Sequence, residues 1–366
     1  MPSQKQISWA SLGEEYLGRA RGVFLVAGTG SFSASGAKAK FQAACGETPV
    51  VRFSDFTENP QLGEISAGVE KFCTSGCDLI VAIGGGSSID IAKSVHILAG
   101  HDAADHAALL RGEKDLTPPA ADRHFIAVPT TFGTGSESTQ FAAVYIGDAK
   151  YSLSHEAGLP DAYVLDPALA LSAPPMVRAS TAIDALCQAI ESYWAKDATD
   201  ESRAYAAEAI PLLRDNVKAY VSGDDLGIAT NMARAANLSG RAINISKTTA
   251  PHALSYGITK RYGVPHGQAV ALTLPAFFSL NAERGDADTK TRMGEIFELL
   301  DVRDGAGAKA WFTALLTATG LKTRVREIAD ISAEDARALA AQVNLERLGN
   351  HPITLTEDDL TTALLA

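Results

Sequence analysis

The sequence predicts an α/β domain over residues 1–166, followed by an all-α domain over residues 167–366. The chain has 366 residues, which exceeds the size at which a single hydrophobic core keeps growing. In the first half, short apolar runs end at glycine or proline and lead into helical segments, a pattern typical of a parallel sheet buried on both faces. In the second half, long helical patterns rich in Ala and Leu replace these runs.

The first domain contains apolar runs that predict strands. These runs are residues 23–27, 50–53, 79–83 and 125–128. Ligands of parallel α/β sheets collect at the carboxyl ends of the strands, so we expect the functional residues of this half just after these runs. Residues 147–161 are expected to form an irregular connection.

Composition and charge limit the kinds of partner. Hydrophobic residues make up 46% of the chain and charged residues 20%, as in ordinary globular proteins. The net charge of −11 argues against a surface for nucleic acid or for an anionic membrane. The cysteines form no C-x-x-C pair, and neither a signal peptide nor a membrane-length apolar run is present, so we expect a reduced, cytoplasmic, soluble protein.

Two glycine-containing segments predict a site for a dinucleotide. The segment 84–90 follows a strand and opens a helix, so its backbone N–H groups can bind phosphate; the alternative is a tight turn without a ligand. Segment 130–137 repeats the arrangement after the next strand. The candidate cofactor-binding residues of these two segments are Gly85, Gly86, Ser87, Asp90, Thr130, Thr131, Thr134 and Ser136.

A third segment, residues 28–33, gives a weaker signal of the same kind. It contributes Gly28 and Ser31 as further candidates for cofactor binding. The third glycine of the dinucleotide fingerprint is replaced by Ser33, so this is not a standard Rossmann motif.

Two histidines and a helix predict a divalent-metal site. Asp184 and Gln188 are four residues apart, so on a helix they share one face, and His252 and His266 follow downstream. Imidazole and carboxylate are common ligands of divalent metals. We expect Ser180 or Thr181 to cap the helix. The alternative is that each histidine is a hydrogen-bonded structural residue, which is the commoner role for a single histidine.

Taken together, these segments resemble the iron-containing, or group III, alcohol dehydrogenases, which share their fold with dehydroquinate synthase. The matching blocks run through most of the chain in family order: Gly84-Gly85-Gly86-Ser87 with Asp90 and Lys93, residues 129–137, Leu159-Pro160-Asp161, Leu165-Asp166-Pro167, Asp184-Ala185-Leu186 and Pro265-His266-Gly267. The resemblance implies a nucleotide domain, a helical domain and a catalytic divalent ion, Fe²⁺ or Zn²⁺. It also implies a homodimer or a higher homo-oligomer.

In the family the ion is held by an aspartate and three histidines. Asp184, His252 and His266 match three of these positions, and Gln188 occupies the fourth. Tyr256 stands where relatives often have a histidine. Gly28 stands where NAD-preferring relatives commonly have aspartate, which leaves room for NADPH as well as NADH, with Ser31 and Ser33 as donors to a phosphate.

The finer pattern resembles the phosphonoacetaldehyde reductases of this family, in residues 188–194, 201–206 and 247–256. This resemblance implies reduction of phosphonoacetaldehyde to 2-hydroxyethylphosphonate, in phosphonate biosynthesis, and makes Gln188 a trait of the branch. A phosphonate suits cationic and hydroxyl donors. The candidate substrate-binding residues near the histidines are Lys247, Thr248, Thr249 and Arg261, with Arg241 a weaker one.

The mechanism we expect is transfer of hydride from NAD(P)H to an aldehyde carbon whose oxygen is polarised by the metal. A serine hydrolase is disfavoured because the chain lacks a Gly-x-Ser-x-Gly elbow. The alternatives are a general short-chain alcohol or lactaldehyde dehydrogenase with the same machinery, a metal-dependent lyase on this fold, and a non-catalytic nucleotide-binding protein.

Overall fold

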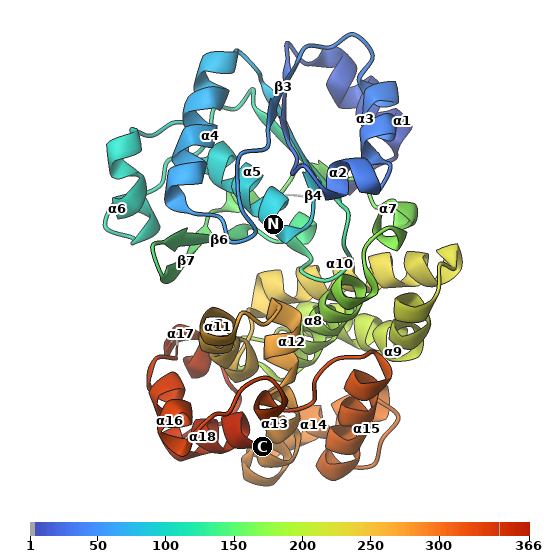
Figure 1. Ribbon diagram of the computed structural model, residues 1–366, viewed down its shortest axis with the longest axis vertical. Helices are drawn as coiled ribbons and strands as arrows, with labels where there is room; N and C mark the ends of the chain where they lie inside the picture. The colour runs from blue at the N-terminus through green and yellow to red at the C-terminus, as the bar shows by residue number, and fades with distance from the viewer. Residues whose placement is uncertain (1–3, 344) are drawn as a thin grey trace. The chain divides into compact units, whose positions relative to one another are not determined.

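The computed structural model describes residues 4–343 and 345–366, and it divides by internal contacts into two compact units (Figure 1). Unit 1 comprises the described residues up to 131 together with 135–173. Unit 2 comprises 132–134 and the described residues from 174 to 366. Contacts alone do not define which segments fold independently, so the domain boundary at residue 166 stays a prediction.

Unit 1 is built on a six-stranded parallel sheet with the order β1-β8-β5-β4-β2-β3. Its strands are β1 (Lys5–Gln6), β2 (Val23–Val26), β3 (Val50–Phe53), β4 (Leu79–Gly84), β5 (His124–Pro129) and β8 (Ala162–Tyr163). The four predicted strands are confirmed as β2, β3, β4 and β5. Because all six are parallel, their carboxyl ends lie at one edge, and β5, β4, β2 and β3 are neighbours there in that order.

Both faces of the sheet are covered, which explains why the central strands β2 and β4 are apolar and buried at every position. Phe24 and Val26 of β2 pack into one core with helices α4 to α6, whereas Val23 and Leu25 pack into a second core with α1 to α3 (Figure 1). The helical segments on the two faces are α1 (Trp9–Ser11), η1 (Leu12–Tyr16), η2 (Leu17–Arg19), α2 (Ser31–Ala34), α3 (Ala37–Cys45), α4 (Leu62–Ser75), α5 (Gly86–Leu98), η3 (Ala103–Asp105) and α6 (His106–Leu110).

An antiparallel hairpin in unit 1 corrects one expectation. Strands β6 (Phe141–Ile146) and β7 (Ala149–Ser154) pair in register, so the irregular connection expected over 147–161 is wrong for residues 149–154. Gly147 has a φ of 57° and permits the tight turn, and the pairing with β6 supplies the hydrogen bonds that a short polar strand needs. The remaining short segments are η4 (Ser136–Ser138), η5 (Glu156–Gly158) and α7 (Pro167–Leu171).

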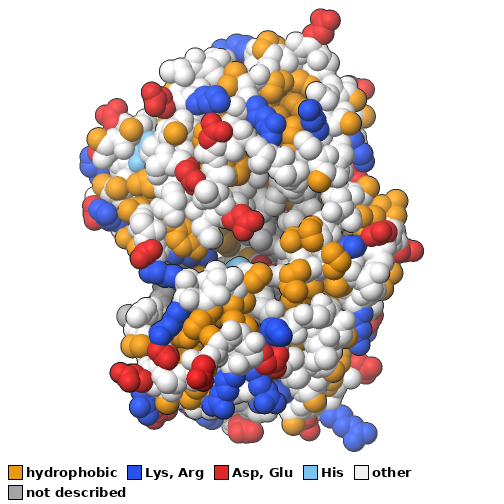
Figure 2. Space-filling view, in the orientation of Figure 1, with side chains coloured by type: hydrophobic (Ala, Val, Ile, Leu, Met, Phe, Trp, Pro, Cys, Tyr) orange, Lys and Arg blue, Asp and Glu red, His pale blue; other side chains and the backbone are white. Residues whose placement is uncertain are grey.

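Unit 2 is helical apart from its connections, as the sequence predicts. Its helical segments are α8 (Pro175–Trp194), α9 (Asp200–Ser222), α10 (Leu226–Ser246), α11 (Ala250–Tyr262), α12 (His266–Ala271), α13 (Leu274–Arg284), α14 (Ala287–Leu299), α15 (Gly305–Ala318), η6 (Val325–Glu327), α16 (Ala333–Ala341), α17 (Leu345–Gly349) and α18 (Glu357–Leu365). Within residues 4–343 and 345–366, no helix is long and apolar enough to cross a membrane. Figure 2 shows acidic and basic side chains interspersed over the viewed face.

Helix α8 is the central element of unit 2, in contact with α9, α10 and α12. It begins at Pro175, where proline is well suited to the first helical position, so the expected cap at Ser180 or Thr181 is wrong. Thr181 lies inside the helix and donates its hydroxyl to the carbonyl of Val177 at 2.9 Å. Residues 182–194 are all buried, so the polar side chains on this segment need partners within the protein.

Candidate active site

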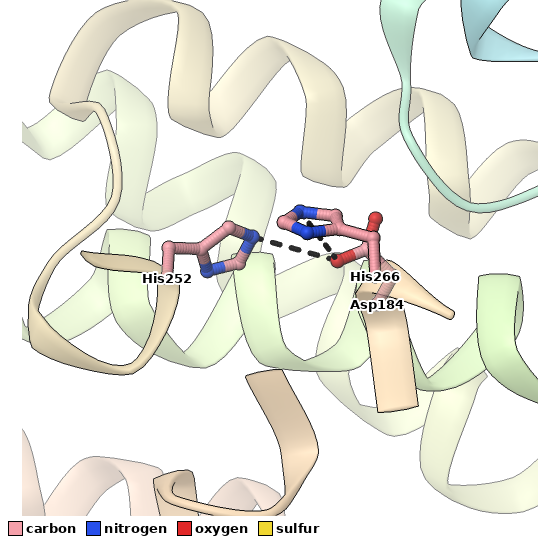
Figure 3. A group of neighbouring side chains, drawn as sticks. All are labelled: Asp184, His252 and His266. Carbon is pink, nitrogen blue, oxygen red and sulfur yellow. Dashed lines mark ion pairs between the residues drawn. The ribbon is translucent and has the colours of Figure 1, made fainter. Parts of the chain in front are cut away.

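Asp184, His252 and His266 come together within unit 2 although they lie on three different helices. Asp184 is on α8, His252 is near the start of α11, and His266 is the first residue of α12. The Nε2 atom of His252 lies 3.4 Å from Oδ1 of Asp184, and the Nε2 atom of His266 lies 3.9 Å from the same oxygen. Figure 3 shows both rings directed at this carboxylate. The sequence-predicted cluster is therefore assembled by the fold.

The geometry of these three side chains fits a divalent ion. Two donor atoms bound at about 2.1 Å to a tetrahedral ion lie about 3.4 Å apart. The His252–Asp184 distance has this value, and the His266 distance is slightly wider. Nε2 of His252 is buried without a hydrogen-bond partner. A buried imidazole lone pair facing a carboxylate oxygen is stable only if a proton or a metal ion lies between them.

Glu191 fixes the orientation of His252. Its carboxylate is fully buried, with Oε1 accepting hydrogen bonds from the backbone N and Oγ1 of Thr249, both at 2.9 Å. Nδ1 of His252 bonds to Oε2 of Glu191. An ionised carboxylate can only accept, so Nδ1 carries the proton, and the lone pair of Nε2 is left for a metal. Trp194 completes the support by donating Nε1 to Oγ1 of Thr249 at 2.9 Å.

The pKa of His252 reflects the two carboxylates beside its ring. Burial lowers the pKa of this imidazole, but the carboxylates of Glu191 and Asp184 outweigh burial and raise the pKa to about 10. In the absence of an ion, a proton therefore occupies the position between His252 and Asp184. Such a site has an excess of negative charge that a divalent cation can neutralise.

Sequence reasoning did not assign Glu191 a role, although a signal was present. Glu191 lies seven residues after Asp184 on α8, and hence on the same helical face. It also interrupts an apolar run beside Ile190. A carboxylate within the buried stretch of a helix requires a partner, and this requirement could have marked the residue.

Gln188 braces Asp184. Its Nε2 donates to Oδ2 of Asp184 at 3.0 Å, and its Oε1 accepts from the hydroxyl of Ser239 at 3.4 Å. Both ends of the amide are thus engaged within the protein, and its role as a metal ligand stays a prediction. Tyr256 stacks on the ring of His266, with centroids 5.9 Å apart and an interplanar angle of 7°. This stacking helps to fix the most exposed of the three side chains.

Gly267 allows α12 to approach α8 closely. A Cβ atom on Gly267 would lie 2.0 Å from the carbonyl oxygen of Ser180 and 2.8 Å from Cβ of Asp184. Any side chain would therefore push the two helices apart. The glycine after His266 is what brings this imidazole to Asp184.

The glycine-containing loops of unit 1 also come together. A Cβ atom on Gly84, whose φ is 159°, would lie 2.3 Å from Oγ of Ser88 and 3.9 Å from Oγ of Ser31. A Cβ atom on Gly85 would lie 3.3 Å from Oγ1 of Thr131. The segments that follow β2, β4 and β5 therefore meet at the carboxyl edge of the sheet, where α5 begins. This backbone cradle fits the phosphates of a dinucleotide.

Asp90 lies inside this part of unit 1 and supports the neighbouring loop. Its Oδ1 accepts from Oγ of Ser136 at 3.3 Å, and its Oδ2 accepts from the backbone N of Ala143 at 3.0 Å. Burial raises the pKa of Asp90. Lys93 donates to Oγ1 of Thr139 at 2.8 Å, and burial lowers its pKa to about 8. These bonds favour a supporting role for Asp90, so its cofactor contact stays a prediction.

The other predicted cofactor-binding residues are placed as follows. Ser87, beside Gly86 at the start of α5, donates to the carbonyl of Glu58. Oγ1 of Thr130 is buried without a hydrogen-bond partner, and its contact with the cofactor stays a prediction. Thr134 lies in the short segment 132–134 that groups with unit 2.

Lys247, which lies five residues before His252 in the chain, has a strained backbone. Its φ of 60° and ψ of −172° fall in a region that side chains rarely adopt, and its side chain is exposed. Asn350 holds the segment by donating Nδ2 to the carbonyls of Ser246 and Thr248, at 2.7 and 3.1 Å. Backbone strain that the surrounding structure maintains is commonly found at functional positions.

The structure separates the predicted substrate-binding residues. Lys247 and Thr248 immediately precede Thr249, which bonds to Glu191. Oγ1 of Thr248 accepts a hydrogen bond from Arg347, a cation that the sequence did not indicate. Arg261 instead forms an ion pair with Asp335. It lies about 13 Å beyond His252 along α11, at about 1.5 Å per residue. Arg241 stacks over the ring of Tyr205, with its Cζ 5.7 Å from the centroid.

Comparison with known proteins identifies the family. Residues 4–167 match the family described as iron-containing alcohol dehydrogenase, and residues 178–366 match the C-terminal region of the Fe-containing alcohol dehydrogenase family. This chain belongs to the iron-containing alcohol dehydrogenase family. The family expected from the sequence is thus confirmed, and so is the expectation of an enzyme.

Two curated relatives illustrate the similarity. The 1,3-propanediol dehydrogenase of Citrobacter freundii is 34% identical over 287 residues, which cover 76% of this chain and 73% of the relative. Long-chain-alcohol dehydrogenase 1 of Geobacillus thermodenitrificans is 35% identical over 226 residues, which cover 61% of this chain. The match spans 55% of the length of that relative.

Solved structures confirm the predicted fold class. A 1,3-propanediol oxidoreductase is 27% identical and superposes with a TM-score of 0.84, covering 99% of this chain and 97% of that one. The sulfoacetaldehyde reductase from Bifidobacterium kashiwanohense, solved in complex with NAD⁺, is also 27% identical and has a TM-score of 0.89. It covers 99% of this chain, and 96% of its own length is matched.

Proposed function

We propose that this protein is a metal-dependent NAD(P)H oxidoreductase that reduces phosphonoacetaldehyde to 2-hydroxyethylphosphonate. One observation carries the proposal: a cationic, strained segment at Lys247–Thr248 is bonded, through Thr249 and Glu191, to the histidine of a divalent-metal cluster. An anionic group and an aldehyde oxygen on one small substrate would use both features.

Residues of unit 2 would hold the ion, Fe²⁺ or Zn²⁺. When bound, the ion would supply Lewis-acid polarisation of the aldehyde oxygen, and NADPH or NADH would supply the hydride. Asp184, His252 and His266 would provide the ligand atoms. Glu191 keeps the proton of His252 on Nδ1, so that Nε2 remains available as a ligand atom. Gln188 stabilises the aspartate through its amide.

The phosphonate would be recognised by cationic and hydroxyl donors at the start of α11. The ammonium group of Lys247 is a compact charge on a flexible chain, and the guanidinium of Arg347 beside Thr248 is suited to two-point binding of oxyanions. The similarity to a sulfoacetaldehyde reductase supports this class of substrate, because sulfoacetaldehyde is also a two-carbon aldehyde with a tetrahedral anionic group. Arg261 is a weaker candidate, since Asp335 neutralises it.

The test compares aldehydes that differ in charge. Oxidation of NADPH and NADH is followed with phosphonoacetaldehyde, propanal and lactaldehyde, after the metal is removed and Zn²⁺ or Fe²⁺ is restored. We expect metal-dependent turnover with a strong preference for phosphonoacetaldehyde. The variant Lys247→Met should raise KM for phosphonoacetaldehyde about tenfold or more, because one bond to a charged group is lost, and leave propanal unaffected. Lys290→Met, which removes an exposed charge on α14, is the matched control.

Each rival function gives a different outcome. Equal use of the neutral aldehydes would indicate a general alcohol or lactaldehyde dehydrogenase. Metal-dependent conversion without net oxidation of the nucleotide would indicate a lyase. Failure to bind any divalent ion would favour a non-catalytic nucleotide-binding protein.

A further inference from the structure

We infer that Arg52 is a specificity-determining residue that binds the 2′-phosphate of NADPH. The inference rests on the nicotinamide chemistry of the proposed function and concerns only which of the two cofactors is preferred. It is carried by the position of one guanidinium group beside the loop that follows β2, and by the open space around Gly28.

Arg52 reaches across the carboxyl edge of the sheet from strand β3. Its Nε and Nη2 donate to the carbonyl of Ala27 at 3.3 and 3.2 Å, and Nη2 also donates to the carbonyl of Gly28 at 2.8 Å. The guanidinium lies 5.0 Å above the ring of Phe32. These contacts hold the charge in place against the 28–33 loop. In the described part of the chain Nη1 of Arg52 donates to no protein acceptor, so this end of the guanidinium is available to a ligand.

The loop beside Arg52 lies next to the segment that fits a pyrophosphate. Oγ of Ser31 is 3.9 Å from the position that a Cβ atom on Gly84 would occupy, and helix α2 contacts strand β4. In the sheet, β2 lies between β4 and β3. A dinucleotide whose phosphates lie at the end of β4 therefore has its adenosine ribose within reach of β2 and β3. The 2′ position would then meet Arg52 and the hydroxyl of Ser31.

Gly28 leaves the space that a 2′-phosphate requires. A Cβ atom built on Gly28 meets no atom within 4 Å, and its φ lies outside the left-handed region, so the glycine is not needed for the turn. A carboxylate at this position would accept from a ribose 2′-OH and repel a phosphate. Asp55, exposed just after β3, would favour NADH instead if its carboxylate accepted a hydrogen bond from the ribose 2′-OH. The fixed cation and the absent carboxylate at Gly28 favour the phosphate.

The experiment measures cofactor binding directly, without an aldehyde. Titration calorimetry of the holoenzyme with NADPH and with NADH gives two dissociation constants for each protein. We expect NADPH to bind more tightly than NADH to the wild type. Arg52→Met should weaken NADPH about ten- to a hundredfold, the value of a hydrogen-bonded ion pair, and change NADH by much less. Gly28→Asp should reverse the preference.

Matched controls separate cofactor recognition from a structural role of Arg52. Arg21→Met removes an equal charge at the opposite edge of the sheet, where Arg21 pairs with Asp78, and should change neither constant. Equal weakening of NADPH and NADH by Arg52→Met would show that Arg52 only shapes the loop and would overturn the inference. A wild-type preference for NADH would also overturn it. Because no aldehyde is present, these results do not depend on which substrate the enzyme reduces.

Discussion

Replacing Glu191 with glutamine should weaken metal binding. Glu191 is not itself a candidate ligand, and it acts through its hydrogen bond to His252. The substitution preserves shape, and the amide oxygen can still accept from Thr249. The amide NH₂ group, however, faces Nδ1 of His252, which must then become an acceptor. The imidazole proton moves to Nε2, the atom directed at Asp184. In the wild type a metal also displaces a proton from Nε2, but Nδ1–H then keeps its bond to Glu191, whereas in the variant Nδ1–H would face the amide NH₂ group without an acceptor.

The expected magnitude follows from the loss of the carboxylate partner. Removal of such outer groups typically costs ten- to a hundredfold in metal affinity, which is about 1.4–2.7 kcal/mol. Because Glu191 is fully buried and accepts several hydrogen bonds, the effect should lie toward the upper end.

Competition between the apoenzyme and a chromophoric chelator for Zn²⁺ measures this effect without turnover. The control is Glu295→Gln, which makes the same chemical change where Glu295 accepts from the hydroxyl of Tyr193 at 2.9 Å. It should leave the dissociation constant of Zn²⁺ unchanged. If Glu191→Gln bound Zn²⁺ as tightly as the wild type while lowering the Tm, Glu191 would be a structural residue only, and the argument would be refuted.

Three further substitutions have defined outcomes. Gln188→His should tighten Zn²⁺ binding about tenfold in the same chelator assay, since an imidazole would offer a ligand atom one helical turn from Asp184, where the amide of Gln188 is engaged by Asp184 and Ser239. Gly267→Ala should lower the free energy of unfolding by about 1–3 kcal/mol in urea and weaken Zn²⁺ binding, because its Cβ would lie 2.0 Å from a carbonyl oxygen of α8. His351 is buried against Asn281, and burial lowers its pKa to about 3 from 6.5. As the pH falls below 6.5, this histidine is protonated in the unfolded chain but stays neutral in the folded protein. It should therefore lower the free energy of unfolding by about 2 kcal/mol between pH 7 and pH 5. His351→Phe should reduce the pH dependence of the urea midpoint over this range by that amount.

The contrary results are equally specific. Unchanged Zn²⁺ affinity in Gln188→His would show that this position is too far from the ion to contribute a ligand. A Gly267→Ala protein of wild-type stability would contradict the close approach of α12 to α8. If His351→Phe retained the full difference in stability between pH 7 and pH 5, other groups such as His96, whose pKa burial lowers to about 4, would be responsible.

The sequence by itself determined the two kinds of architecture and the three side chains that meet in the candidate metal site. Apolar runs ending in glycine or proline located β2, β4 and β5, because a strand buried on both faces must be apolar throughout. Asp184, His252 and His266 were recognisable because their residue types suit a divalent metal and because they match ligand positions of the family. Local signals failed where pairing decided the outcome, as in β7, whose polar residues form a strand only against β6.

Only the tertiary structure decided which side chains support the site. The role of Glu191 depends on α11 lying beside α8, so that its carboxylate meets His252, a contact between residues far apart in the chain. Arg347 meets Thr248 for the same reason, whereas Arg261, closer to His252 in sequence, lies at the far end of its helix and pairs with Asp335. Local spacing fixes which residues share a helical face, but the packing of helices against one another determines which faces meet.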